Sequence, residues 1–311
     1  TDGAGLHRRK DHLYSLFVPA RARSVFPCFD QPDLKGRLAL TLDMPADWEA
    51  VANTPVRSAT QLGERRRVGF EPTCPLPTYL FAFAAGQFAS THGESRRVGR
   101  VFHRASERTA VAREARTICH LHDDALAWME DYTGIAHPFG KLDIVLLPDF
   151  PFAGMEHPGA IFYNAASQLL ESSATPERRL ARARTIAHEV AHLWFGDLVT
   201  MTWFDDVWLK EVCAELMASK VAASSGRLPD DDLLFLLQHH PQAYDVDRTA
   251  GANPIRQPLD NLEDAGQLYG PMIYMKAPIL FRQLEQLCRS EEHTSELQSH
   301  LNLVCRLLLE K

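Results

Sequence analysis

The clearest chemical signal in the sequence is a pair of histidines four residues apart, His188 and His192, with Glu189 directly after the first. On a helix this spacing projects both imidazoles from one face, about one turn apart. Two ring nitrogens placed in this way can bind one zinc ion. Glu189 would then stand where it can act as a base toward water at the metal. The alternative is a helix whose histidines only pack against their neighbours.

A third ligand is available in Glu211, which follows His192 after eighteen intervening residues. The segment between them is long enough to bring two helices side by side. Two imidazoles and one carboxylate leave zinc with a positive charge and an open position, which is typical of a catalytic site. We therefore expect one Zn²⁺ per chain, held by His188, His192 and Glu211. Glu215 lies one turn further on, and it either orients a ligand histidine or is an exposed acid.

Both helices that must carry these residues are predicted from the sequence. Thr175 supplies a capping hydroxyl, Pro176 the first helical position and Glu177 an early acid, so a helix is expected to begin there and to run through the histidines. A second helix is expected at about 207–223. Residues 107–132 carry apolar residues at helical spacing without Pro or Gly, which predicts a further helix upstream.

The first third of the chain is predicted to be rich in β-structure. Short apolar or alternating runs are separated there by Pro, Gly, Asp and Asn, which favour turns. The run TYLFAFAAGQF is apolar on both faces, as in a strand buried inside a sandwich. The expected strands lie at 38–45, 65–72, 78–88, 141–150 and 154–164. Strands followed by helices and further strands indicate an α+β fold.

Charge and hydropathy give no support for two classes of partner. The chain has 311 residues and a net charge of −7, which lacks the basic footprint of a nucleic-acid-binding protein. No apolar run approaches the roughly 20 residues that span a bilayer. The basic clusters at Arg65–Arg67 and Arg178–Arg184 are expected to be solvated faces. The sequence predicts no cell compartment.

Several stretches together resemble the gluzincin aminopeptidases, the family of the alanyl (neutral) aminopeptidases and leukotriene A4 hydrolase. They are HEVAHLWFGDLVTMTWFDDVWLKE, FAGMEHPGAI, VFPCFDQPDLKGRLALTL and LYGPMIYMKAPIL, and the resemblance covers nearly all of residues 6–288. It implies a partial N-terminal β-sandwich domain over 1–105 and a thermolysin-like zincin catalytic domain over 106–288. It also implies that the parent protein continues into a C-terminal helical domain, so the chain is expected to be a fragment.

The resemblance implies a zinc-dependent aminopeptidase, which hydrolyses the N-terminal residue of peptides. Glu189 is then the general base toward a zinc-activated water. Tyr274 corresponds to the family's catalytic tyrosine and would stabilise the oxyanion. Tyr269, five residues earlier, is the second candidate for this role. From the residues alone, Tyr274 would be a core aromatic.

The segment FAGMEHPGAI resembles the family's exopeptidase motif, and it implies that Gly154, Met155 and Glu156 bind the substrate. Glu156 would supply the fixed negative charge that binds the free α-ammonium group of the substrate. The expected partners are therefore peptides with a free N-terminus. The chain departs from the family pattern near these motifs at Val18, His157, Asp197, Lys210, Val212 and Cys213. Other readings are a different zinc hydrolase, of the epoxide-hydrolase kind, or a non-catalytic binding module on the same fold.

The end of the chain has a different character. Residues 289–300, RSEEHTSELQSH, look like the in-frame translation of a sequencing-library adapter. We therefore expect residues 289–311 to be a non-native tail. The alternative is a genuine amphipathic helix, since LNLVCRLLLEK is largely apolar.

Overall fold

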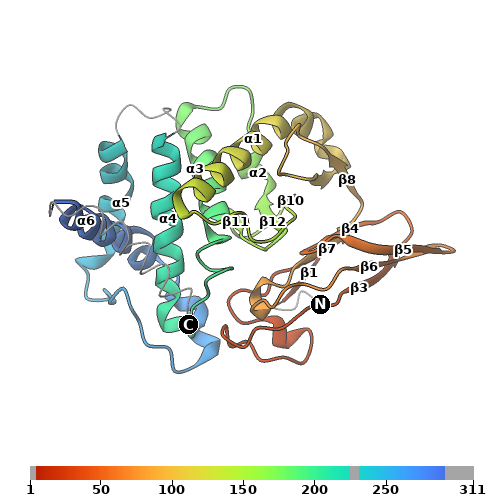
Figure 1. Cartoon of the computed structure of the whole chain (residues 1–311), viewed down its shortest axis with the longest axis horizontal. Coiled ribbons are helices and arrows are strands. Elements are labelled where there is room, and N and C mark those ends of the chain that lie inside the picture. The colour runs from red at the N-terminus through yellow and green to blue at the C-terminus, as the bar shows by residue number, and fades with distance from the viewer. Residues whose placement is uncertain (1–4, 225–230, 291–311) are drawn as a thin grey trace.

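The computed structural model describes residues 5–224 and 231–290, which form three β-sheets and a set of helices (Figure 1). The four-stranded sheet has the order β1 (Leu6–Arg8), β2 (His12–Ser15), β7 (Phe83–Gly86), β4 (Glu49–Ala52). The three-stranded sheet has the order β3 (Thr41–Pro45), β6 (Arg65–Phe70), β5 (Val56–Leu62). The five-stranded sheet has the order β11 (Gly154–Met155), β12 (Ala160–Asn164), β10 (Asp143–Leu147), β9 (Val101–Arg104), β8 (Phe88–Thr91).

The two smaller sheets pack face to face as an N-terminal sandwich. Successive residues of a strand point to opposite faces, and strand β4 shows this directly. Ala50 and Ala52 pack against Val68 of the three-stranded sheet, while Val51 points the other way, into a cluster that contains Phe162 of the five-stranded sheet. The four-stranded sheet is therefore buried on both faces.

The five-stranded sheet lies between this sandwich and the helices. Its strands β9, β10 and β12 are parallel, and β8 and β11 pair antiparallel at the two edges. In β10, Val145 and Leu147 face the sandwich whereas Ile144 and Leu146 face the helices, which is why this strand reads as one apolar run. Because β9 pairs with β10, the sheet continues across the expected boundary at residue 105, and that domain division stays a prediction.

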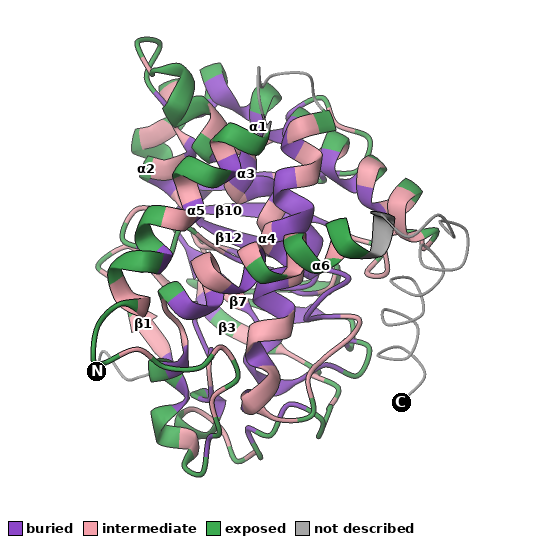
Figure 2. Ribbon diagram, turned by 90° about the vertical axis from the view of Figure 1, so that its left-hand side faces the viewer, coloured by how far each residue is buried: buried purple, intermediate pink, exposed green. Residues whose placement is uncertain are grey.

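The helices are α1 (Arg108–Thr133), α2 (Ala165–Gln168), α3 (Pro176–His192), α4 (Val207–Ser224), α5 (Asp231–Asp247) and α6 (Ala277–Ser290). Helices α1, α3 and α4 share one buried cluster with the five-stranded sheet, and Figure 2 colours much of α3, α4, β10 and β12 as buried. Helix α3 begins as expected, because the Thr175 hydroxyl accepts a hydrogen bond from the Arg178 backbone N–H. None of the helices in the described parts combines the length and apolar character that a bilayer crossing requires.

Three expectations from the sequence were wrong in detail. The run at 78–88 is not one strand, because it forms a 3₁₀ turn at Thr78–Leu80 before β7. The stretch 154–164 forms two antiparallel strands, β11 and β12, instead of one. In the cluster Arg178–Arg184, two side chains are buried: Arg182 is paired with Glu114 and Arg184 with Glu215. Most of the predicted tail, residues 291–311, lies outside the described residues, so the expectation of a non-native tail stays a prediction.

A buried histidine in α1 gives a testable prediction about acid stability. His122 donates from Nδ1 to the Ile118 carbonyl and accepts at Nε2 from the Tyr163 hydroxyl, so it is held neutral. Burial lowers the pKa of His122 from its usual 6.5 to about 4. Between these values the unfolded chain binds a proton that the folded chain does not, so stability falls as pH falls from 6.5 toward 4.

We expect the free energy of unfolding of His122→Gln to fall by about 3 kcal/mol less than that of the parent between pH 7 and pH 4.5, because the variant no longer takes up about one proton on unfolding. Urea unfolding between pH 7 and pH 4.5 measures it as the slope of unfolding free energy against pH. His120→Gln is the matched control, since His120 is exposed on the same helix. An unchanged slope in His122→Gln would show that His122 is not held neutral.

Candidate functional site

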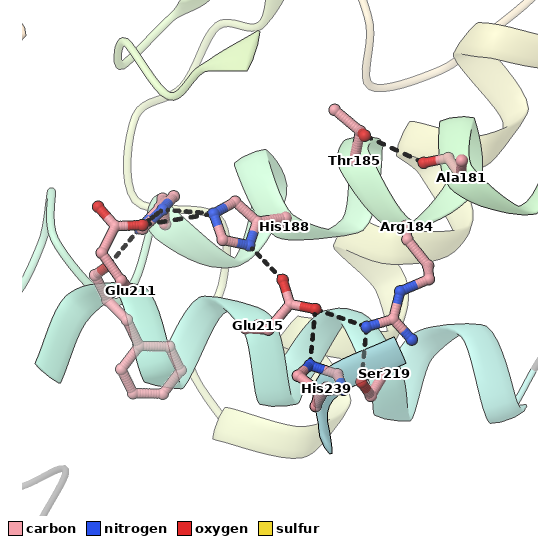
Figure 3. A network of polar contacts seen from close by, with 10 residues as sticks. Ala181, Arg184, Thr185, His188, Glu211, Glu215, Ser219 and His239 are labelled. Carbon is pink, nitrogen blue, oxygen red and sulfur yellow. Dashed lines mark hydrogen bonds and ion pairs between the residues drawn. The ribbon is translucent and has the colours of Figure 1, made fainter. Parts of the chain in front are cut away.

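Helices α3 and α4 present two facing rows of polar side chains. One row is Arg184, His188 and His192, and the other is Glu211, Glu215 and Ser219, each with a spacing of four residues. This spacing places each row on a single helix face. The helices run in opposite directions, so Arg184 faces Ser219 and Glu215 at one end of the rows, and the histidines face Glu211 at the other (Figure 3).

The three expected metal ligands converge. The Nε2 atoms of His188 and His192 are 3.0 Å apart, and Glu211 Oε2 lies 3.5 Å from the first and 3.3 Å from the second. Zinc bonds of about 2.0–2.2 Å in tetrahedral geometry separate ligand atoms by about 3.3–3.6 Å. The two distances to Glu211 lie in this range and the distance between the histidines is slightly shorter, so the donor set fits this ion after a small separation of the two rings. Among the described residues, no other group of His, Cys, Asp and Glu side chains converges in this way.

Hydrogen bonds at the far nitrogens orient both imidazoles. His192 Nδ1 donates to the Phe195 carbonyl at 2.9 Å, and His188 Nδ1 donates to Glu215 Oε2 at 3.2 Å. In the neutral ring, whose single proton is then on Nδ1, the lone pair of each Nε2 points at the shared centre. Burial opposes protonation of His188, but its hydrogen bonds to Glu211 and Glu215 raise its pKa well above the usual range. The carboxylates thus favour positive charge at this centre.

Glu215 is itself held by two further groups. Its Oε1 accepts from Arg184 Nη2 at 2.5 Å and lies 3.3 Å from Nε2 of His239, a fully buried residue of α5 (Figure 3). Arg184 also donates to the Ser219 hydroxyl at 3.0 Å. Glu215 therefore contacts His188, one of the candidate metal ligands, and its role in orienting that histidine stays a prediction.

We expect Glu215→Gln to weaken zinc binding by about 10–100-fold, since the carboxylate that accepts from His188 is lost. Competition with a chelator of known zinc affinity measures the change. Glu171→Gln, at an exposed loop position, is the control and should leave the affinity unchanged. Equal zinc affinities in the two variants would contradict the orienting role.

Glu189 points toward strand β11. A Cβ atom at Gly154 would lie 2.5–2.6 Å from the carboxyl group of Glu189, so only glycine permits this approach of backbone to carboxyl. Burial raises the pKa of Glu189 to about 8, with the neighbouring carboxylates Glu156 and Glu211 adding to the rise. A carboxylate whose pKa is raised is a stronger base, once it is ionised, than an ordinary carboxylate.

The exopeptidase-like segment lies against the same centre. Glu156 is buried, and its Oε1 accepts from Lys210 Nζ at 2.6 Å. Burial opposes ionisation of Glu156, but the Lys210 ammonium lowers its pKa to about 2. Met155 packs between the sheets. Gly154, Met155 and Glu156 all line a cavity of about 770 Å³, whose wall also includes the three candidate metal ligands.

Both candidate tyrosines line this cavity. Tyr274 lies in a π-helical turn, Met272–Lys276, with its ring centroid 6.4 Å from that of His188. Burial raises its pKa well above the usual range, so its hydroxyl stays protonated. The Tyr269 hydroxyl is also buried, and it has no hydrogen-bond partner among the described residues.

The sequence analysis did not place two residues, Arg184 and His239, in the polar network around Glu215. Arg184 precedes His188 by four residues, so the same-face spacing that indicates His192 also indicates Arg184. No local pattern points to His239, because it reaches Glu215 only through the packing of α5.

Two family models and several curated aminopeptidases match the sequence of the chain. A model of the peptidase family M1 domain matches residues 119–304, and a model of the peptidase M1 N-terminal domain matches residues 7–80. Aminopeptidase N of Streptomyces lividans is 31% identical over 312 residues, covering 96% of this chain and 36% of that protein.

Two further relatives show the same pattern. Probable aminopeptidase 2 of Sulfurisphaera tokodaii is 29% identical over 295 residues, covering 94% of this chain and 37% of that protein. Puromycin-sensitive aminopeptidase of Caenorhabditis elegans is 30% identical over 271 residues, covering 86% of this chain and 28% of that protein. The chain thus spans 28–37% of the length of these three curated relatives.

Proposed function

Because the chain belongs to peptidase family M1, we propose that it carries the catalytic centre of a zinc-dependent aminopeptidase that removes the N-terminal residue of peptides. Members of this family depend on zinc in general. The observation that carries the proposal is the convergence of His188, His192 and Glu211 in one cavity with Glu189 and Glu156. In this proposal, residues 1–105 are the N-terminal β domain and residues 106–288 the catalytic domain.

His188, His192 and Glu211 would hold the metal. Zinc would there supply a Lewis acid, which lowers the pKa of water and polarises the scissile carbonyl. Glu189 accepts a proton from the attacking water and passes it to the leaving amine. The protonated Tyr274 hydroxyl donates a hydrogen bond to the carbonyl oxygen as it becomes negative.

Glu156 and Gly154 place the first residue of the substrate in this proposal. Both line the wall of the cavity at β11, where the Glu156 carboxylate can accept a hydrogen bond from the N-terminal nitrogen. Glu215 keeps His188 oriented through the hydrogen bond to Nδ1.

The test is release of leucine from leucyl-p-nitroanilide by the zinc-loaded chain. We expect release that stops when 1,10-phenanthroline removes the metal and returns when zinc is added back. A folded, zinc-loaded chain that released no amino acid from this or any short peptide would contradict the proposal and favour the binding-module reading.

A further inference from the structure

An ammonium group of the chain itself stands in the part of the cavity that would receive the substrate's N-terminus. Lys210, on α4, donates to Glu156 Oε1 at 2.6 Å and lies 3.1 Å from Glu211 Oε1. The side chains of Lys210 and Glu156 are 5% and 4% exposed. Lys210 Nζ also lies 5.3 Å from the centre of the Tyr79 ring, a favourable cation–π position. Lys210 is therefore fixed against Glu156.

This pairing changes what Glu156 offers to a ligand. A buried carboxylate with an ammonium at 2.6 Å forms a pair whose charges largely cancel. A second ammonium, on a substrate, would bind the same carboxylate group only a few ångströms from Lys210. The two cations would repel each other strongly, since a buried site screens charges poorly.

The other charges around the cavity do not compensate for this loss. Its charged walls are three cations, Arg21, Arg184 and Lys210, and four carboxylates, Glu156, Glu189, Glu211 and Glu215. Glu211 and Glu215 contact the histidines, and Glu189 has the role of the base. Zinc would add two positive charges to this set. Val18, on the wall, contributes only apolar surface.

An uncharged N-terminus escapes this repulsion and finds partners in the same place. An amide N–H can donate to the Glu156 carboxylate, and an acyl oxygen can accept from the Lys210 ammonium. A cavity of about 770 Å³ is large enough for a blocked peptide end, since ligand pockets commonly have roughly 300–1,000 Å³.

We propose that Lys210 is a specificity-determining residue, which neutralises Glu156 so that the site takes peptides with an uncharged, acylated N-terminus about as well as peptides with a free ammonium. This inference rests on the proposed function, and it names the substrate class of the same cavity. Lys210 touches the substrate's N-terminal end and takes no part in proton transfer.

The first test compares two ligands on one protein. The full chain carrying Glu189→Gln is loaded with zinc so that it binds without turnover, and the dissociation constants of leucyl-glycyl-glycine and its N-acetyl form are measured by calorimetry. A preference for the free amine below about tenfold supports the proposal, and a preference of tenfold or more overturns it. If neither peptide binds, the proposed function itself is contradicted, and this inference with it.

The second test removes the cation. In the same background, Lys210→Met is expected to raise the preference for the free amine by at least about tenfold, because Glu156 is then left uncompensated. Lys210→Arg keeps the charge and is the matched control, which should leave the preference near that of the parent. Zinc per chain is measured in each variant, since Lys210 also contacts Glu211.

An unchanged preference in folded, zinc-loaded Lys210→Met would overturn the proposal. If the methionine variant does not fold, the preference of the parent chain decides alone.

Discussion

Glu189→Gln is expected to lower kcat for release of an N-terminal residue by a factor of about 10²–10⁴, the usual contribution of a general acid–base group. The amide has nearly the shape of the carboxyl group but cannot accept a proton from water. Glu189 is buried beside Gly154 and is not one of the three converging ligands, so the loss should come from chemistry and not from metal binding.

Steady-state kinetics on leucyl-p-nitroanilide give the change in kcat, and metal analysis of the same samples gives zinc per chain. Zinc content and melting temperature should equal those of the parent. A variant that kept a tenth or more of the parent kcat would exclude Glu189 as the base.

The second large effect concerns the two tyrosines. We expect Tyr274→Phe to lower kcat by about 10²–10³, as the loss of one oxyanion donor does in other hydrolases. Its ring stands 6.4 Å from that of His188, beside the metal centre, and its hydroxyl stays protonated. Phenylalanine keeps the ring and removes only the donor.

Tyr269→Phe is the matched control, because Tyr269 lines the same cavity and loses the same atom. Its effect on kcat should be less than about tenfold, the size of a modest change in packing. If Tyr269→Phe caused the greater loss of kcat, the oxyanion donor would be Tyr269 and not Tyr274.

The candidate metal site shows what residue spacing can predict. Residues four apart share a helix face, and this rule places His188 with His192 on α3 and Glu211 with Glu215 on α4. That the two rows meet depends on the packing of α3 against α4, which the rule alone does not give. The start of α3 was predictable for a similar reason, since Thr175 caps it by a bond to its own first turn. Interactions of this kind are local, so the sequence contains them.

What the sequence could not predict depends on tertiary packing. The basic cluster on α3 looks like a solvated face, but Arg182 and Arg184 turn inward because Glu114 of α1 and Glu215 of α4 meet them there. The pairing of Lys210 with Glu156 joins α4 to the end of β11, and nothing in either segment indicates the other. The run at 78–88 begins with a 3₁₀ turn at Thr78–Leu80, and its strands then divide between two sheets, β7 in the four-stranded sheet and the start of β8 in the five-stranded sheet.

The measurement that tests the central claim most directly is zinc per chain in the purified, folded protein, with Glu211→Ala as the control. We expect about one zinc per chain, with its binding abolished or greatly weakened in Glu211→Ala, because two imidazoles alone make a poor site. Folded protein that bound no zinc, or that bound it equally well without Glu211, would contradict the metal centre, and the proposed function of this chain would fall with it.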